Sequence, residues 1–192
     1  MTVVDYGVLS GKKPRKSLLV RLKSHAGRNS QGRITTRHQG GGRKKLYRLV
    51  DFRQNMLGAR ATVESIEYDP YRTAFIALIK YENGRHGYIL APHGLSVGDG
   101  IVVEEAAPLR VGNRLRLKNI PVGYQIHNAE LKPEGGGRLA RSAGSYAEVL
   151  ANADGYTDLK LSSGEVRRVP WDCFASVGQV SNAEHNLAVS GK

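Results

Sequence analysis

The chain has 192 residues, of which 40% are hydrophobic and 24% are charged, and its formal net charge is +12. This length allows one domain of ordinary size or two small ones. No apolar run approaches the roughly 18 residues of a membrane span, and the N-terminal residues lack the apolar stretch of a secretory signal. We therefore expect a protein without a membrane partner.

The whole excess of positive charge lies in the first quarter of the chain. Residues 1–53 hold 14 Lys and Arg against two acids, whereas residues 54–192 hold 15 of each kind. A basic arm on a neutral body predicts binding to nucleic acid or to an anionic membrane surface. A membrane helix needs a wide apolar face, but Ile34 is the only large aliphatic residue between positions 24 and 45. Nucleic acid is therefore the favoured partner.

Residue types that carry catalytic or metal chemistry are few. Cys173 is the only cysteine, and the six histidines are scattered at spacings unlike those of a zinc site. A single cysteine excludes an internal disulfide and favours a reducing compartment. No nucleophile–base set is recognisable, so we predict no enzyme activity, no catalytic residue, no metal and no cofactor.

The basic arm contains GRITTRHQGGGRKK over residues 32–45. A nucleotide-phosphate loop is a poor explanation of its three glycines, because the Walker spacing and its Ser or Thr are missing. A flexible linker is the plain alternative, although apolar residues resume at Leu46. Close approach to an RNA backbone uses every residue type present, since glycine lets the main chain lie against phosphates that the cations neutralise. We favour this third use, in an arm that becomes ordered only when RNA is present.

Beyond residue 54 the sequence alternates between strand-sized apolar segments and turn signals. Residues 73–81, TAFIALIKY, predict a buried strand, and residues 87–90 predict the strand that returns from it. Asn83-Gly84 between them predicts a type I′ hairpin turn. No stretch has a helical period over three turns, so the pattern is typical of small antiparallel barrels.

The second half of the chain contains three further segments of interest. The composition changes at residues 106–113, which predicts the join between two barrels. Residues 114–118, RLRLK, alternate so that three cations share one face, which suits a phosphate-facing surface, with a solvated strand as the alternative. Residues 132–144 repeat the theme of three glycines beside cations. Residues 169–177 alternate as a strand with Cys173 on its apolar face, which predicts a buried thiol rather than a nucleophile.

Several long blocks identify a resemblance, and they are GRNSQGRITTRHQGGGRKKLYRLVDF, ESIEYDPYRTAFIALI, YILAPHGL, NIPVGYQIHNAELKPEGGGRLARSAGSYAEVL, SGEVRRV and VGQVSNAEH. In these blocks and in their order the chain resembles large-subunit ribosomal protein two in its bacterial and organellar form, from about residue 26 onward. The resemblance implies an all-β fold with a basic RNA-binding extension (1–41), an OB-like barrel (42–106) and an SH3-like barrel with a glycine-rich loop (107–192). It also implies a structural constituent of the large ribosomal subunit, with large-subunit rRNA and neighbouring ribosomal proteins as partners.

The expected rRNA contacts follow from the resemblance, except for three that come from the charge pattern. The arm provides Arg28, Arg33, Arg37, His38, Gly40, Gly41, Gly42, Arg43, Lys44 and Lys45. A turn provides Arg72, for which a merely exposed arginine is an equal alternative, and the RLRLK segment provides Arg114, Arg116 and Lys118. The second glycine-rich segment and its approach provide His127, Asn128, Gly135, Gly136, Gly137, Arg138, Arg141 and Ser142. The block near residue 185 provides Asn182 and His185, where a local pair of Glu184 with His185 is the alternative.

Two departures from the family pattern lead to further expectations. Residues 1–25 match the family's extension poorly, and the family's basic histidine- and glycine-rich tail is not in this sequence. We expect either a separate polypeptide that carries the tail or a shortened form. Because split ribosomal genes are common in organelles, a mitochondrial ribosome is favoured over one in a bacterial cytoplasm.

One alternative function remains open at this point, a free-standing OB-fold factor that binds single-stranded RNA. Such a factor stacks bases on exposed aromatic side chains of a barrel face. Aromatic residues make up 7% of the chain, and many of them lie in apolar strand segments. The alternative is therefore the weaker one.

Overall fold

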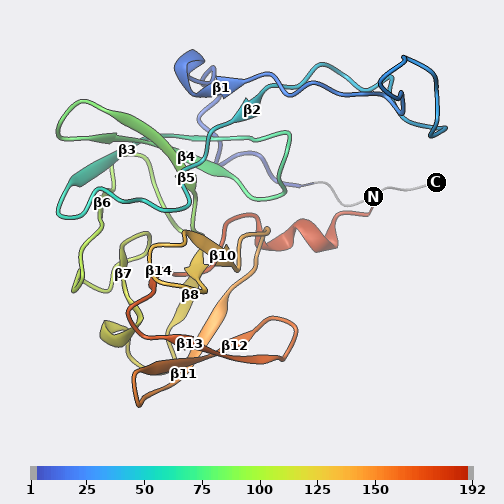
Figure 1. The fold of residues 1–192 in the computed structure, drawn as a ribbon. Coiled ribbons are helices and arrows are strands. Elements are labelled where there is room, and N and C mark those ends of the chain that lie inside the picture. The colour runs from blue at the N-terminus through green and yellow to red at the C-terminus, as the bar shows by residue number, and fades with distance from the viewer. Residues whose placement is uncertain (1–3, 190–192) are drawn as a thin grey trace.

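The computed structural model describes residues 4–189, which form two β-barrels and an arm that projects from the first (Figure 1). The all-β prediction, an OB-like barrel followed by an SH3-like barrel, is confirmed. Among these residues there is no α-helix, and three short 3-10 helices interrupt the strands, η1 (Lys16–Leu18), η2 (Leu117–Asn119) and η3 (Ala183–Leu187). No helix in this part of the chain has the length and apolar character needed to cross a membrane.

The first barrel is built on a four-stranded antiparallel sheet in the order β5-β4-β3-β6. Its strands are β3 (Arg60–Glu67), β4 (Ile76–Tyr81), β5 (His86–Leu90) and β6 (Gly100–Val102). Every residue of β4 except Lys80 is buried, which explains the apolar run that predicts it. The strand begins later than predicted because Ser181 and Asn182 bind the main chain before it, at Phe75 N and Thr73 O.

The turn after β4 differs from the predicted type. Tyr81 N donates a hydrogen bond to Arg85 O, so the loop has three residues, 82–84. Only Gly84 in this loop has a positive φ, of 79°, whereas a type I′ turn needs two such residues. The hairpin is confirmed and its type I′ assignment is wrong, because Glu82 belongs to the loop and not to the strand.

The second barrel is built on a six-stranded sheet in the order β13-β12-β11-β8-β14-β7. Its strands are β7 (Arg114–Arg116), β8 (Gln125–His127), β11 (Ala147–Ala153), β12 (Tyr156–Leu161), β13 (Val166–Pro170) and β14 (Phe174–Val177), and β9 (Ala129–Glu130) pairs separately with β10 (Gly137–Leu139). Leu117, Ile126, Val149 and Leu159 are fully buried at its centre. Residues 169–177 form two strands rather than the predicted one, because a turn at residues 171 and 172 separates β13 from β14.

A buried ion pair fixes the inside of the second barrel. The side chains of Arg114 in β7 and Glu130 in β9 are 0% and 2% exposed, and Arg114 Nη2 lies 3.0 Å from Glu130 Oε1. Arg114 Nη1 also donates to Asn128 O, while Glu130 accepts hydrogen bonds from the main-chain N–H groups of Gly136 and Phe174. Burial lowers the pKa of Arg114, and the Glu130 carboxylate opposes this shift. The pair therefore ties β7 to β9, β14 and the glycine-rich loop.

The chain returns from the second barrel to the first after β14. Val180 forms an antiparallel bridge with Pro92, and Ser181 N donates to Ala91 O over 2.9 Å. Together with the Ser181 and Asn182 side chains before β4, these bonds make residues 178–182 a seam between the barrels.

The arm begins and ends on the first barrel. Its two limbs pair there as β1 (Leu19–Val20) and β2 (Tyr47–Arg48). Leu18 and Val50, on either side of this pair, pack against a buried cluster that includes Tyr88. The base of the arm is therefore anchored by apolar contacts, whereas every residue from 28 to 46 is exposed.

Candidate nucleic-acid interface

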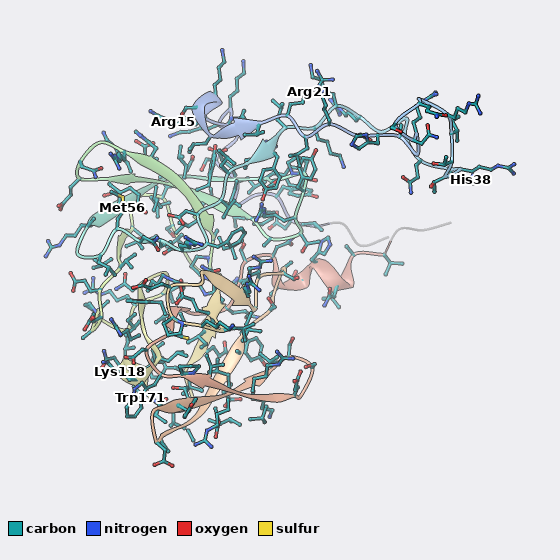
Figure 2. The ribbon with its side chains drawn as sticks, in the orientation of Figure 1. Arg15, Arg21, His38, Met56, Lys118 and Trp171 are labelled. Atoms are coloured by element: carbon teal, nitrogen blue, oxygen red, sulfur yellow. The ribbon has the colours of Figure 1, made fainter. Side chains whose placement is uncertain are left out.

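The tip of the arm is a closed loop over residues 27–36. Thr36 N donates to Gly27 O over 3.1 Å, and the Asn29 side-chain oxygen accepts a hydrogen bond from Arg33 N over 2.9 Å. Polar side chains of the tip and limbs face solvent, as the positions of Arg21 and His38 show in Figure 2. Few apolar contacts hold the arm beyond its base. Segments with few such contacts open locally at a low cost in free energy. Ordering of the arm by RNA stays a prediction.

A hollow of about 530 Å³ lies between the two limbs of the arm. Its described lining includes five cations and no carboxylate, and the cations are Arg21, Lys23, Arg43, Lys44 and Lys45. The triglycine of residues 40–42 also lines it, with φ of 109° at Gly40 and 68° at Gly41. A Cβ added at Gly41 would meet no atom within 4 Å, so the backbone conformation, not crowding, favours glycine there. The result is bare main chain among cations.

A second hollow, of about 510 Å³, combines aromatic rings with arginines. It is lined by Tyr47, Phe52, Tyr71, Arg72, Thr73, Arg141 and Ser142. Both guanidinium groups lie over the Phe52 ring, at 4.5 Å for Arg141 and 5.5 Å for Arg72. Arg72 comes from the first barrel and Arg141 from the second, so Phe52 holds cations of both barrels at one place.

A third hollow, of about 340 Å³, continues from the turn at residues 69–72 toward η3. Asn182 and His185 line it together with Tyr6, Tyr68, Pro70, Tyr71, Arg72 and Thr73. His185 does not pair with Glu184 in an ion pair within the described residues, and its buried Nδ1 has no hydrogen-bond partner there. Tyr71 lines all three hollows and so connects them into one surface.

The structure thus brings many of the expected contacts together around Tyr71. Lining residues among them are Gly40, Gly41, Gly42, Arg43, Lys44, Lys45, Arg72, Arg141, Ser142, Asn182 and His185. Arg28, Arg33, Arg37 and His38 extend this surface along the arm, and Gly135 and Arg138 are exposed on the glycine-rich loop. Contact of these residues with RNA remains a proposal, taken up below.

Five expected contacts are buried, and the structure contradicts their placement on an exposed surface. They are Arg114, His127, Asn128, Gly136 and Gly137. The second triglycine serves packing between barrels: Gly137 N and the Asn128 side chain both donate to Phe52 O. A Cβ at Gly137 would overlap the Asn128 side chain, and one at Gly136 would lie 2.9 Å from Arg53 Cγ.

His127 has a structural role in this packing. Its Nδ1 lies 2.9 Å from Gly178 O, and burial lowers the pKa of His127 to about 4. The imidazole is therefore neutral near pH 7 and donates to that carbonyl. A neutral buried ring offers nothing to a phosphate.

The predicted three-cation face of residues 114–118 is also wrong. Arg114 is buried, and the chain turns into η2 at Leu117. Arg116 is partly exposed and Lys118 is exposed, but both lie near Asp172, at 2.9 and 3.4 Å. Lys118 lies far from the arm in Figure 2.

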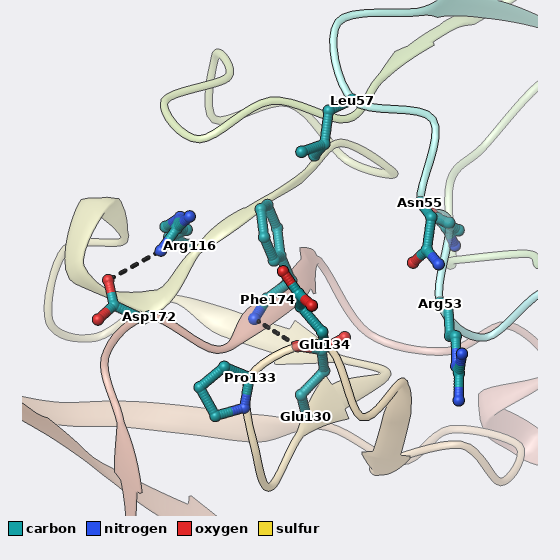
Figure 3. Close-up of a pocket in the computed structure, with 10 residues that line it drawn as sticks. Arg53, Asn55, Leu57, Arg116, Glu130, Pro133, Glu134, Asp172 and Phe174 are labelled. Atoms are coloured by element: carbon teal, nitrogen blue, oxygen red, sulfur yellow. Dashed lines mark hydrogen bonds and ion pairs between the residues drawn. The ribbon is translucent and has the colours of Figure 1, made fainter.

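The cavity beside Arg116 has a different character from the three hollows. It has a volume of about 300 Å³ and lies between the linker of residues 53–57 and the second barrel (Figure 3). Glu130, Glu134 and Asp172 are among its lining residues, and Asp172 pairs with Arg116. Carboxylates at this position disfavour phosphate, so we leave this cavity outside the interface.

Several residues of the interface were missed by the sequence analysis. They are Arg21, Lys23, Tyr47, Phe52, Tyr71 and Thr73. One available signal was Tyr71 itself, an aromatic residue in a turn directly before Arg72. The two arm cations were available from the charge count, whereas the grouping of Tyr47 and Phe52 with Arg141 depends on contact between the barrels.

Family models account for most of the chain. The model of the RNA-binding N-terminal domain of ribosomal proteins L2 matches residues 15–103, and that of the L2 C-terminal domain matches residues 110–192. The chain belongs to the ribosomal protein L2 family. It is also similar to large ribosomal subunit protein uL2 of Hyphomonas neptunium (strain ATCC 15444), with 52% identity over all 192 residues and 70% of that protein.

Membership of the L2 family confirms the resemblance and the function expected from it. The chain is a non-enzymatic structural constituent of the large ribosomal subunit that binds rRNA. The relative named here is bacterial, which gives no support to the mitochondrial preference. That preference, and the separate polypeptide carrying a tail, stay untested predictions.

Proposed function

We propose that this L2 protein holds large-subunit rRNA on the continuous surface formed by the arm and the three hollows around Tyr71. The observation that carries the proposal is the hollow between the limbs of the arm, where five cations and three glycines meet without a carboxylate among the described lining residues. Cations there neutralise phosphates and release condensed counterions. Glycine main chain lets the sugar–phosphate backbone approach closely.

The second barrel contributes position as well as contacts. The seam of residues 178–182 and the hydrogen bond from Gly137 N to Phe52 O hold the barrels together. Arg141 is thereby placed beside Arg72 on the Phe52 ring. Such contacts recognise the shape of folded RNA rather than a base sequence. The partners we propose are large-subunit rRNA and the ribosomal proteins next to it.

The test replaces Arg37, Arg43, Lys44 and Lys45 together by alanine and follows entry of the tagged chain into large subunits by sedimentation. Binding to large-subunit rRNA in vitro should weaken. The negative slope of log K against log salt should become shallower by about 3, which is four lost phosphate contacts at about 0.7 each. The melting temperature should not change, because these side chains are exposed.

The matched control removes four exposed cations from the second barrel, Lys118, Lys160, Arg167 and Arg168. The change in net charge is the same, but none of these residues lines the three hollows. The control should assemble normally. Normal assembly of the arm variant, or equal loss in both variants, would show that the arm surface is not the rRNA site.

A further inference from the structure

Tyr71 is an exposed aromatic side chain on a rigid turn. Tyr71 is 42% exposed. Asp69 anchors this turn to the barrel. Its side chain is fully buried and accepts hydrogen bonds from Tyr71 N and from the Arg72 side chain. Exposed tyrosines are common in this chain, but Tyr71 differs from the others because it lines all three hollows.

The neighbours of Tyr71 match the parts of a single unstacked nucleotide. Its ring meets Tyr47 edge to face, with centroids 5.5 Å apart. Arg72 and Arg141 lie in the same hollow, together with the hydroxyl groups of Thr73 and Ser142. Aromatic faces stack on bases, arginines pair with phosphates, and hydroxyls bond with base edges or the ribose.

The shape of the site favours an unpaired nucleotide over a continuous double helix. The hollow has a volume of about 510 Å³ and is open to solvent, so a single base can enter it from the RNA side. Bases inside a helix are stacked on each other and offer no face to a protein ring, whereas bases in loops and bulges do. Phosphates alone would need no aromatic lining.

We propose that an unpaired nucleobase of the rRNA stacks on Tyr71 in the second hollow, with its phosphate held by the exposed Arg141, beside Arg72, whose charge is paired with Asp69. This inference rests on the proposed function and adds the kind of RNA element that this surface recognises. The element is a loop or bulge with one nucleotide turned outward.

The experiment measures the affinity of the full chain for transcribed large-subunit rRNA over a range of salt concentrations. Tyr71→Ala should weaken binding about 5- to 150-fold, the range expected for loss of one base–aromatic stack. Tyr71→Phe should bind like the unmodified protein, since the ring remains. The matched control is Tyr156→Ala, which removes a 45% exposed ring from β12 in the second barrel and should leave binding unchanged.

Two readouts separate stacking from an indirect effect on the arm. The salt slope should stay the same in Tyr71→Ala, because stacking releases no counterions, whereas loss of a phosphate contact lowers the slope by about 1. Ultraviolet crosslinking followed by mass spectrometry should attach a nucleotide to the peptide containing Tyr71, and chemical probing should find that nucleotide unpaired.

Three results would overturn the stacking proposal, and a fourth would count against the proposed function. Unchanged affinity of Tyr71→Ala, in a protein whose arm variant loses binding, would overturn the stacking proposal and leave the proposed function intact. A lower salt slope in Tyr71→Ala, or a crosslink to a base-paired nucleotide, would overturn it as well. If the arm variant binds rRNA as tightly as the unmodified chain, that result would instead count against the proposed function.

Discussion

Replacing Arg114 by alanine should strongly destabilise the second barrel. The substitution removes a side chain that is fully buried and leaves the Glu130 carboxylate, 2% exposed, with two main-chain N–H donors and no counter-charge. Breaking a buried ion pair by removing one partner costs about 3–5 kcal/mol. For a chain of this size that corresponds to a fall in melting temperature of about 6–20 °C.

The control for this substitution lies two residues further along β7. Arg116 pairs with Glu105 and Asp172, but its side chain is 26% exposed and theirs are 60% and 45% exposed. Exposed pairs of this kind contribute about 0–1 kcal/mol. Arg116→Ala should therefore unfold close to the unmodified protein.

Urea unfolding followed by tryptophan fluorescence suits this comparison. Trp171 is the only tryptophan and lies at the turn between β13 and β14, so its emission reports on the second barrel. Replacing Arg114 and Glu130 together by methionine and leucine should recover part of the loss, because an apolar pair leaves no buried charge, while the N–H groups of Gly136 and Phe174 lose their acceptor. If Arg114→Ala unfolds at the same urea concentration as Arg116→Ala, the reasoning from burial is refuted.

Three further predictions concern packing and titration. Gly137→Ala should destabilise the chain by about 1–3 kcal/mol in urea unfolding, because its Cβ would overlap Asn128, while Gly42→Ala, with open space around it, should not. Because burial lowers the pKa of His127 to about 4, the unfolded chain binds a proton that the folded chain excludes between pH 6.5 and 4. As the pH falls through this window, the free energy of unfolding should decrease by on the order of 3 kcal/mol. His127→Gln should lack that part of the decrease. Equal pH dependence of unfolding in both proteins would contradict this. Burial raises the pKa of Cys173 to about 12, so a thiol reagent should label it only after unfolding, and rapid labelling of the native protein would show an accessible thiol.

Features that depend on residues close together in the sequence were predicted well. The apolar run of β4 and the glycine after it specify a hairpin, and the cations around residues 40–42 specify an exposed arm. Cys173 was expected in the core from its place in an alternating segment and is fully buried. In each case the deciding contacts lie within a few residues or depend only on period and charge.

Features that depend on distant partners were not predictable in this way. Arg114 looks like a surface cation until Glu130, 16 residues later, is placed beside it in the barrel. The second triglycine resembles the first in sequence, but Gly137 N donates a hydrogen bond to Phe52 O across the barrel junction. Both segments place three glycines beside cations, and the tertiary neighbours separate the exposed first triglycine from the largely buried second one.

The seam of residues 178–182 has a consequence for the newly made protein. The sheet of the first barrel is complete at Val102, about 80 residues before the seam leaves the ribosome that is making it. At synthesis rates of about 5–20 residues per second this interval lasts about 4–16 s. During it the arm is already attached to a folded barrel, but Arg141 has no fixed place beside Arg72. The nascent chain therefore presents the arm and the first-barrel part of the aromatic hollow before Arg141 and Ser142 complete that hollow.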